Sequence, residues 1–159
     1  MIRRWAAFGT IAILSLGATS AAGSDVRYFP NIMYGHILIG NGASRYETGF
    51  AASARKETRV TVKLFNEKGE PMEATFLDET GDVAGTGSSF EFFLAPERTV
   101  RIRIQLTPEE AGHDVAVKTG WATFAASENI DVMALVRVTR PDGSLLSRYL
   151  AAAEVPPTS

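Results

Sequence analysis

The chain has 159 residues with 16 basic and 18 acidic side chains, a formal net charge of −2, and no cysteine. A mildly acidic chain is not expected to bind nucleic acid, because phosphate contacts need a basic face. Without cysteine it can form neither a disulfide nor a thiolate metal site. Nine Phe, four Tyr and two Trp argue against disorder. These counts predict one globular domain of ordinary size.

The N-terminal residues 1–22 are predicted to be a signal peptide that is removed on export. Arg3 and Arg4 form a positive start, residues 5–16 are apolar, and residues 20–22 (Ser-Ala-Ala) are small enough for a signal peptidase. A retained anchor is less favoured, because a spanning helix needs roughly 20 apolar residues. The Ala- and Arg-rich composition suggests a bacterial source. We therefore expect a periplasmic or extracellular protein with no transmembrane anchor after cleavage.

Residues 23–152 are predicted to form one β-domain, followed by a flexible Pro-rich tail at 153–159. Apolar and polar residues alternate in short segments, a pattern typical of half-buried strands. Strands are predicted at 46–52, 59–65, 73–77, 90–94, 99–106, 115–124, 130–139 and 145–151, with a weaker piece at 27–29. So many strands leave no room for crossover helices, so pairing should be antiparallel. We expect an all-β sandwich of two sheets and about eight strands.

Turn residues separate these segments. Residues 66–71 (Asn-Glu-Lys-Gly-Glu-Pro) and 140–143 (Arg-Pro-Asp-Gly) each predict a hairpin. Residues 107–112 combine a capping Thr, a Pro, a Glu at the third helical position and a Gly stop, which predicts a single helical turn. Residues 85–88 (Gly-Thr-Gly-Ser) are expected to be a flexible connector.

Strands 90–94 and 99–106 are expected to pair across residues 95–98. Their apolar residues must share one face, which would place Glu91 opposite Arg101 or Arg103 as an exposed ion pair. An arginine stripe that binds anions is the alternative. Segments 115–124 and 130–139 are apolar on both faces in places, as expected of central strands. Trp121 is expected to be a core anchor between the sheets, with an exposed ring that stacks on sugar as the alternative.

Two resemblances support the sandwich. Leu106, followed by Glu110-Ala111-Gly112, resembles the link before the penultimate strand of immunoglobulin domains, although Asp114 and Ala116 replace that family's tyrosine and cysteine. A broader resemblance, to uncharacterised secreted bacterial β-sandwich repeat domains, rests on Tyr28-Phe29-Pro30, Gly49-Phe50, Val62 to Asn66 with Gly69-Glu70-Pro71, Phe90 to Leu94 with Pro96, and Gly120-Trp121-Ala122. This resemblance implies an immunoglobulin-like sandwich outside the cytoplasm and supplies no catalytic residue.

Candidate binding residues fall in two segments. Residues 28–46 hold Tyr28, Tyr34, His36 and Tyr46 among Gly and Asn, so this least strand-like segment is the expected ligand-binding loop. The alternative is that its apolar residues tuck it under the sheets.

Asp78, Glu79 and Asp82 cluster in an acidic loop that could hold calcium, although the order of carboxylates differs from a calcium-binding loop. A solvated acidic turn is the favoured interpretation.

No motif for catalysis stands out. The two histidines, His36 and His113, lack a metal-ligand spacing, and neither a Gly-x-Ser-x-Gly elbow nor a phosphate loop occurs. We expect no cofactor and favour a non-catalytic structural or interaction module that binds another envelope or extracellular protein. A carbohydrate or small-ligand binder using residues 28–46 is the alternative, and a hydrolase is the least favoured class.

Overall fold

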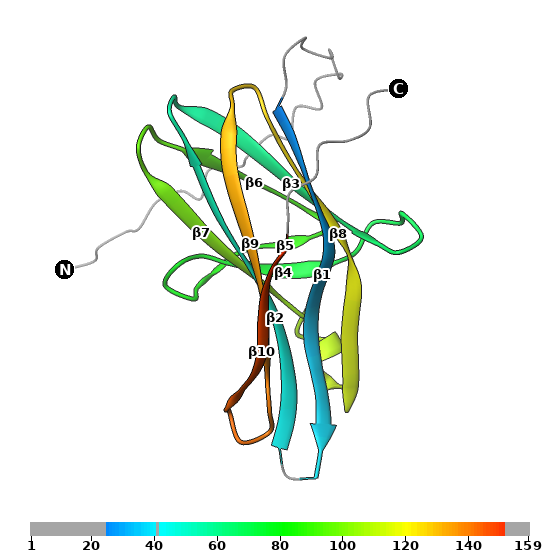
Figure 1. Cartoon of the computed structure of the whole chain (residues 1–159). Helices are drawn as coiled ribbons and strands as arrows, with labels where there is room; N and C mark the ends of the chain where they lie inside the picture. Colours follow the sequence, from blue (N-terminus) through cyan, green and yellow to red (C-terminus); the bar gives the residue numbers. More distant parts are fainter. Residues whose placement is uncertain (1–24, 41, 152–159) are drawn as a thin grey trace, which may run out of the picture.

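The structure, a computed structural model, describes residues 25–40 and 42–151 (Figure 1). The predicted signal peptide at 1–22 and the predicted tail at 153–159 lie outside these residues. The described chain contains ten strands and one 3-10 turn, η1 (Glu110–Gly112). The strands are β1 (Asp25–Ile39), β2 (Gly42–Ala54), β3 (Thr58–Asn66), β4 (Ala74–Leu77), β5 (Val83–Gly87), β6 (Ser89–Leu94), β7 (Thr99–Gln105), β8 (Val115–Ala126), β9 (Ile130–Thr139) and β10 (Leu145–Ala151).

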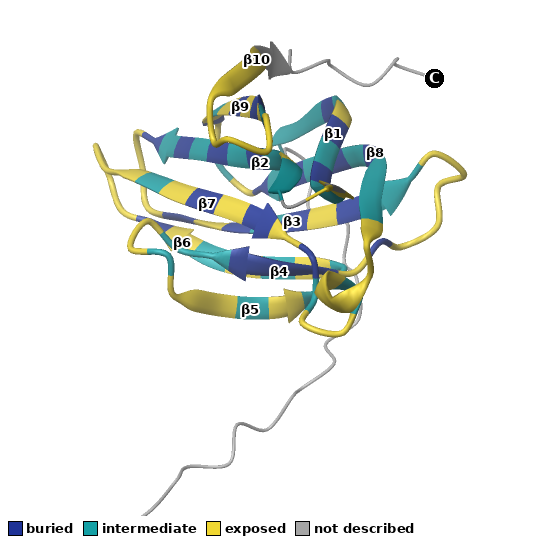
Figure 2. Cartoon of the chain, turned by 90° about the horizontal axis from the view of Figure 1, so that it is seen from below, coloured by how far each residue is buried: buried dark blue, intermediate teal, exposed yellow. Residues whose placement is uncertain are grey.

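The prediction of an all-β, antiparallel fold is confirmed, and β9 and β10 have the predicted bounds. Hydrogen-bonded neighbours follow the order β5-β4-β7-β2-β1-β8-β3-β6, with β9 on β2 and β10 on β9. β1 and β7 pair with the same edge of β2 at different positions: β1 pairs with residues 42–46 and β7 with residues 48–53. The end strands β5 and β6 are consecutive in the chain, so the sheet curls until it nearly closes (Figure 2).

The curled sheet encloses one hydrophobic core. Alternate residues of each strand point inward, so that Val60, Val62 and Leu64 of β3 are fully buried. Phe29, Phe50 and Phe124 form a cluster at its centre, with ring centroids 6.0, 5.5 and 4.8 Å apart. Full burial of such a side chain stabilises the fold by about 2–3 kcal/mol.

Residues 35–39 of β1 pair with β2, whereas the residues of β1 before Gly35 do not. At Gly35 the backbone adopts a φ of 129°. A Cβ at this position would lie 1.9 Å from the carbonyl oxygen of Ala116, so only glycine fits between β1 and β8. On the N-terminal side of Gly35, the buried Thr48 hydroxyl takes the place of the β2 backbone as the hydrogen-bond partner of β1. It accepts a hydrogen bond from the Met33 N–H (3.0 Å) and donates one to the Met33 carbonyl (2.7 Å).

The expected pairing of residues 90–94 with 99–106 is wrong. β6 pairs with β3, and β7 pairs with β2 and β4. Glu91 consequently lies opposite Thr61 and forms an ion pair with Arg59 at 3.7 Å. Alternation fixes which side chains share a face, but it does not fix the strand that pairs with them. The linker 95–98 instead turns away, and the Glu97 N–H donates to the Ala54 carbonyl.

Two segments that were expected to be loops are strands. Residues 28–46 belong mainly to the β1–β2 hairpin, and the expected connector at 85–88 begins within β5. Both are rich in Gly, which local propensity disfavours in strands. Backbone pairing overrides that propensity: β1 pairs with the distant strand β8 along most of its length, and β5 pairs with the preceding strand β4.

The local turn predictions fare better. Residues 140–143 join β9 and β10 as a hairpin, with the Arg140 N–H bonded to the Ser144 carbonyl at 2.8 Å. The turn at 66–71 closes through Asn66 and Glu70, but β4 then pairs with β5 and β7 and not with β3. The predicted helical turn is present and Thr107 and Glu110 form reciprocal hydrogen bonds, but η1 begins only at Glu110 and has Glu109, not the predicted Thr107, as its N-cap.

Candidate functional site

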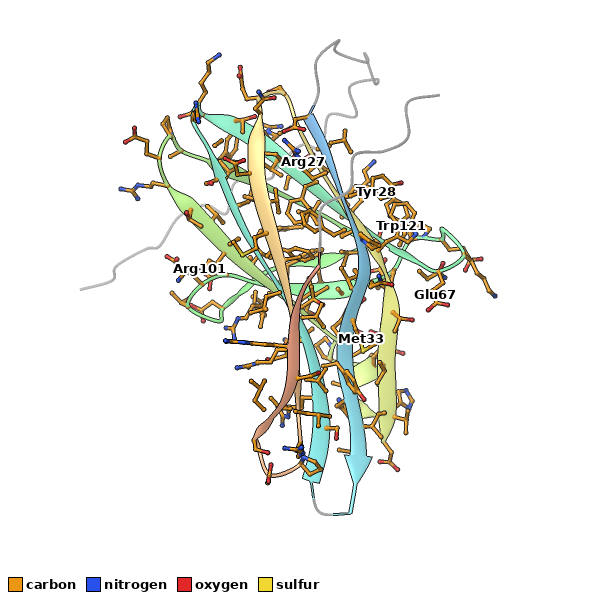
Figure 3. The ribbon with its side chains drawn as sticks, viewed as in Figure 1. Arg27, Tyr28, Met33, Glu67, Arg101 and Trp121 are labelled. Atoms are coloured by element: carbon orange, nitrogen blue, oxygen red, sulfur yellow. The ribbon has the colours of Figure 1, made fainter. Side chains whose placement is uncertain are left out.

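A column of three aromatic rings stands on the outer face of β1, β8 and β3. Trp121 stacks on Phe65 with a centroid distance of 4.1 Å and on Tyr28 at 4.9 Å, with interplanar angles of 18° and 16°. The inward side chains of β8 are the buried Ala122 and Phe124, so Trp121 points outward (Figure 3). The prediction that Trp121 is a core anchor between sheets is therefore wrong, because β8 is apolar on both faces and alternation alone cannot assign its orientation.

The column also limits what Trp121 can bind. Both faces of its indole are covered by neighbouring rings, so only the ring edges are presented to solvent. Stacking on a sugar requires a free ring face. Cross-strand aromatic pairs of this type stabilise a sheet by roughly 0.2–1 kcal/mol each. The primary effect of the column is thus to hold β1, β8 and β3 in register.

A depression of about 650 Å³ lies beside this column, where β1 bulges. The β1–β8 register shifts between Phe29 and Ile32, and Asn31 adopts a φ of 63° within the bulge. Bulges re-aim side chains and occur next to functional sites. The depression is lined by Tyr28, Pro30, Asn31, Ile32, Met33, Glu67, Thr119, Gly120 and Trp121.

The charge in the lining of the depression comes from Glu67, at its rim. Glu67 follows β3 in the turn at 66–70, and its carboxylate accepts a hydrogen bond from the Thr119 hydroxyl at 2.8 Å. Gly120 contributes bare backbone to the lining. A Cβ on Gly120 would lie 1.9 Å from the Phe65 carbonyl oxygen, so β3 and β8 approach too closely for a side chain. The site combines aromatic and apolar walls with one carboxylate and would favour an uncharged or cationic ligand.

The four predicted ligand-binding residues do not form one site. Tyr28 lies in the outer column, whereas Tyr34 lies on the opposite side of the strand and is fully buried, because the bulge between them shifts the alternation. His36 contacts the His113 carbonyl through Nε2 at 2.8 Å, and Tyr46 lies opposite Gly35. The alternative that this segment packs against the core holds for Tyr34.

Tyr34 takes part in a polar network that joins β1, β8, η1 and the segment before β4. Its hydroxyl donates to the Glu73 carbonyl at 2.6 Å, and Lys118 Nζ donates to the same oxygen at 2.9 Å. Lys118 also forms an ion pair with Glu110. Burial, together with the charges of Glu110 and Glu73, raises the pKa of Tyr34 far above its ordinary value. The phenol therefore stays protonated and serves to tie β1 to the segment before β4.

The acidic loop is an ordered turn. Asp78 Oδ1 accepts hydrogen bonds from the N–H groups of Thr80, Gly81 and Asp82 and from the Thr80 hydroxyl. The Thr80 hydroxyl and these backbone groups lower the pKa of Asp78. Glu79 lies in the same turn, and Asp82 contacts the Thr80 hydroxyl. Within residues 25–40 and 42–151 no group of three metal-ligating side chains is found, so calcium binding here stays a prediction.

Because β7 does not pair with β6, two arginines of β7 do not lie opposite their expected partner, Glu91. Arg101 and Arg103 lie opposite Ala51 and Gly49 of β2, and neither forms an ion pair with another described residue. Arg103 leans toward the acidic turn, since a Cβ on Gly81 would be 3.0 Å from its Nη2. The arginine stripe that the sequence left open as an alternative is therefore exposed on this face.

Sequence reasoning missed the depression itself. Its origin is the extra residue in β1, and the only local signal was Pro30-Asn31 inside an otherwise extended segment, since Asn tolerates positive φ. Glu67 and Thr119 are far apart in the chain and meet only through the β3–β8 pairing.

No family model, curated protein or solved structure matches the chain. Among the described residues, no helix has the length and apolar character needed to cross a membrane. The site must therefore be interpreted from its own chemistry.

Proposed function

We propose that the chain is a non-catalytic interaction module, exported to the bacterial envelope, that binds another envelope or extracellular protein through the edge of β10. The proposal includes an immunoglobulin-like arrangement of two layers, with β7, β2 and β9 in one and β1, β8, β3 and β6 in the other. The two-layer arrangement is supported by β1, which is not paired with β2 before Gly35.

The open edge of β10 carries this proposal. Within the described chain β10 pairs with β9 along one edge, and no strand is hydrogen-bonded to its other edge. Its seven residues include one charged side chain, Arg148, and its first two residues, Leu145 and Leu146, are about half exposed. An edge without several charges or a proline is open to an added strand. β5 and β6 are also end strands of the sheet, but they have only five and six residues and lie near each other where the sheet nearly closes, and short or covered edges resist pairing.

The test is site-specific photo-crosslinking in exporting cells. A benzophenone side chain at Ser147 should give one discrete adduct with a second protein. The matched control is Lys63, an exposed residue on β3, a strand that is paired on both sides. An absence of adducts at Ser147, or the same adducts at Lys63, would contradict strand addition.

Binding of a small ligand is the second candidate function, and the depression beside Tyr28 favours it. The depression includes residues 28 and 30–33 of the predicted segment 28–46, whereas Tyr34, His36 and Tyr46 of that segment do not line it. A neutral oligosaccharide would meet the Glu67 carboxylate, the Thr119 hydroxyl and the tyrosine ring. A glycan array on which the protein binds, with the signal lost in Glu67→Gln and retained in Glu70→Gln, would support it. A blank array would remove this candidate.

A further inference from the structure

Exposed apolar side chains gather on one hairpin of the fold. Four of the eight large hydrophobic residues that are exposed in the described chain lie on β9 and β10: Met133 at 56%, Leu135 at 37%, Leu145 at 49% and Leu146 at 52%. They form two pairs: Leu145 and Leu146 lie next to the turn, and Met133 and Leu135 lie further along β9, with Arg137 and Arg148 between the pairs. Single exposed hydrophobics are ordinary on a protein surface, whereas grouped ones mark an interaction site.

The same hairpin carries a concentration of arginine. Arg137 and Arg148 occupy directly opposed positions on β9 and β10, and Arg140 lies in the connecting turn. Arg45 of β2 pairs with Thr139 beside that turn. We call the surface formed by these arginines and the exposed leucines the hairpin face. Like charges directly opposite each other disfavour sheet formation, so this arrangement is unfavourable unless an anion is nearby.

The carboxylates near the hairpin face neutralise only part of this charge. Glu47 accepts a hydrogen bond from Arg137 Nε at 2.8 Å and so compensates that arginine. Asp142 accepts from the Ser144 N–H at 2.8 Å and lies in the turn beside Arg140. Asp131 is a third carboxylate, exposed on the same side of β9 as Met133 but at the end of β9 far from the turn. Four arginines against three carboxylates leave the hairpin face with a net positive charge, although the whole chain has a formal net charge of −2.

We propose that the hairpin face docks on an anionic phospholipid surface. Arginines match the phosphate groups, while the leucines and Met133 enter the interfacial region between them. A membrane is favoured over a soluble polyanion because the apolar side chains would gain nothing from a polyanion in water. The docking uses the outward face of the hairpin and does not depend on strand addition at the β10 edge.

Vesicle sedimentation tests this proposal with the folded protein. The protein should bind vesicles containing phosphatidylglycerol, bind phosphatidylcholine vesicles weakly, and lose binding as salt is raised. Arg140→Gln/Arg148→Gln should weaken binding by at least about tenfold, because each basic residue near an anionic surface contributes roughly fivefold. Leu145→Ser/Leu146→Ser should weaken it as well.

The matched control for charge is Lys63→Gln/Lys68→Gln, which removes two exposed cations from β3 and the turn that follows it. It should bind as the parent protein does. Equal binding to both kinds of vesicle, or an equal loss in this control, would overturn the proposal. So would polyglutamate binding as tight as vesicle binding together with an unchanged Leu145→Ser/Leu146→Ser variant, since the site would then be one for a soluble polyanion. If the leucine variant fails to fold, the two charge variants decide.

Discussion

Replacing Thr48 by Val removes the hydroxyl that links β2 to β1 where the backbones of the two strands are not paired. The side chain is fully buried, and its hydroxyl bonds both the N–H and the carbonyl of Met33. Valine has nearly the same shape, so packing is kept while two backbone groups lose their partner. A buried polar group without a partner costs about 1–3 kcal/mol. Since Met33 is only partly buried, we expect a loss below the sum for two fully buried groups, roughly 2–3 kcal/mol in the free energy of unfolding.

Chemical denaturation followed by circular dichroism measures this loss. The midpoint should fall with an unchanged slope, and Tm should fall by roughly 6–12 °C. Thr48→Ser keeps the hydroxyl and should recover most of the stability. Thr86→Val on the exposed side of β5 is the matched control and should leave stability within about 0.5 kcal/mol of the parent. A Thr48→Val protein as stable as this control would refute the bridging role of the hydroxyl.

Three further outcomes follow from the structure. Because the pKa of Tyr34 is raised above its ordinary value of 10.0, this residue favours folding below that pH and loses its contribution as the pH rises further; Tyr34→Phe should therefore show a shallower loss of stability in alkaline denaturation, and an identical profile would contradict the assignment. Gly120→Ala should destabilise the protein by about 2 kcal/mol or more in thermal melts, because its Cβ would meet the Phe65 carbonyl, whereas Gly112→Ala, which has open space around it, should not. Asp78 has a lowered pKa and so stabilises the fold above the ordinary carboxyl range and not in acid; Asp78→Asn should lower Tm at neutral pH, with the difference vanishing as the pH falls through that range, and a difference that persists in acid would exclude the ionised carboxylate as its cause.

The candidate site was only partly predictable from the sequence. Tyr28 was identified as a binding residue and does line the depression, whereas Tyr34 was grouped with it and is buried on the opposite side. A single inserted residue at the bulge reverses which side chains face inward, and no local pattern marks it beyond Pro30-Asn31. Glu67 joins the site through the pairing of β3 with β8, which brings it to Thr119, 52 residues away in the chain.

The sequence by itself determined where most strands lie and which turns join them. Alternation has a period of two residues and turn chemistry acts within four, so both can be recognised locally, as for β9, β10 and the turn between them. Only the tertiary structure decided the strand partners, the outward orientation of Trp121 and the unpaired state of Arg101. These depend on how the whole sheet curls to bury its phenylalanines, which is a property of contacts between distant segments.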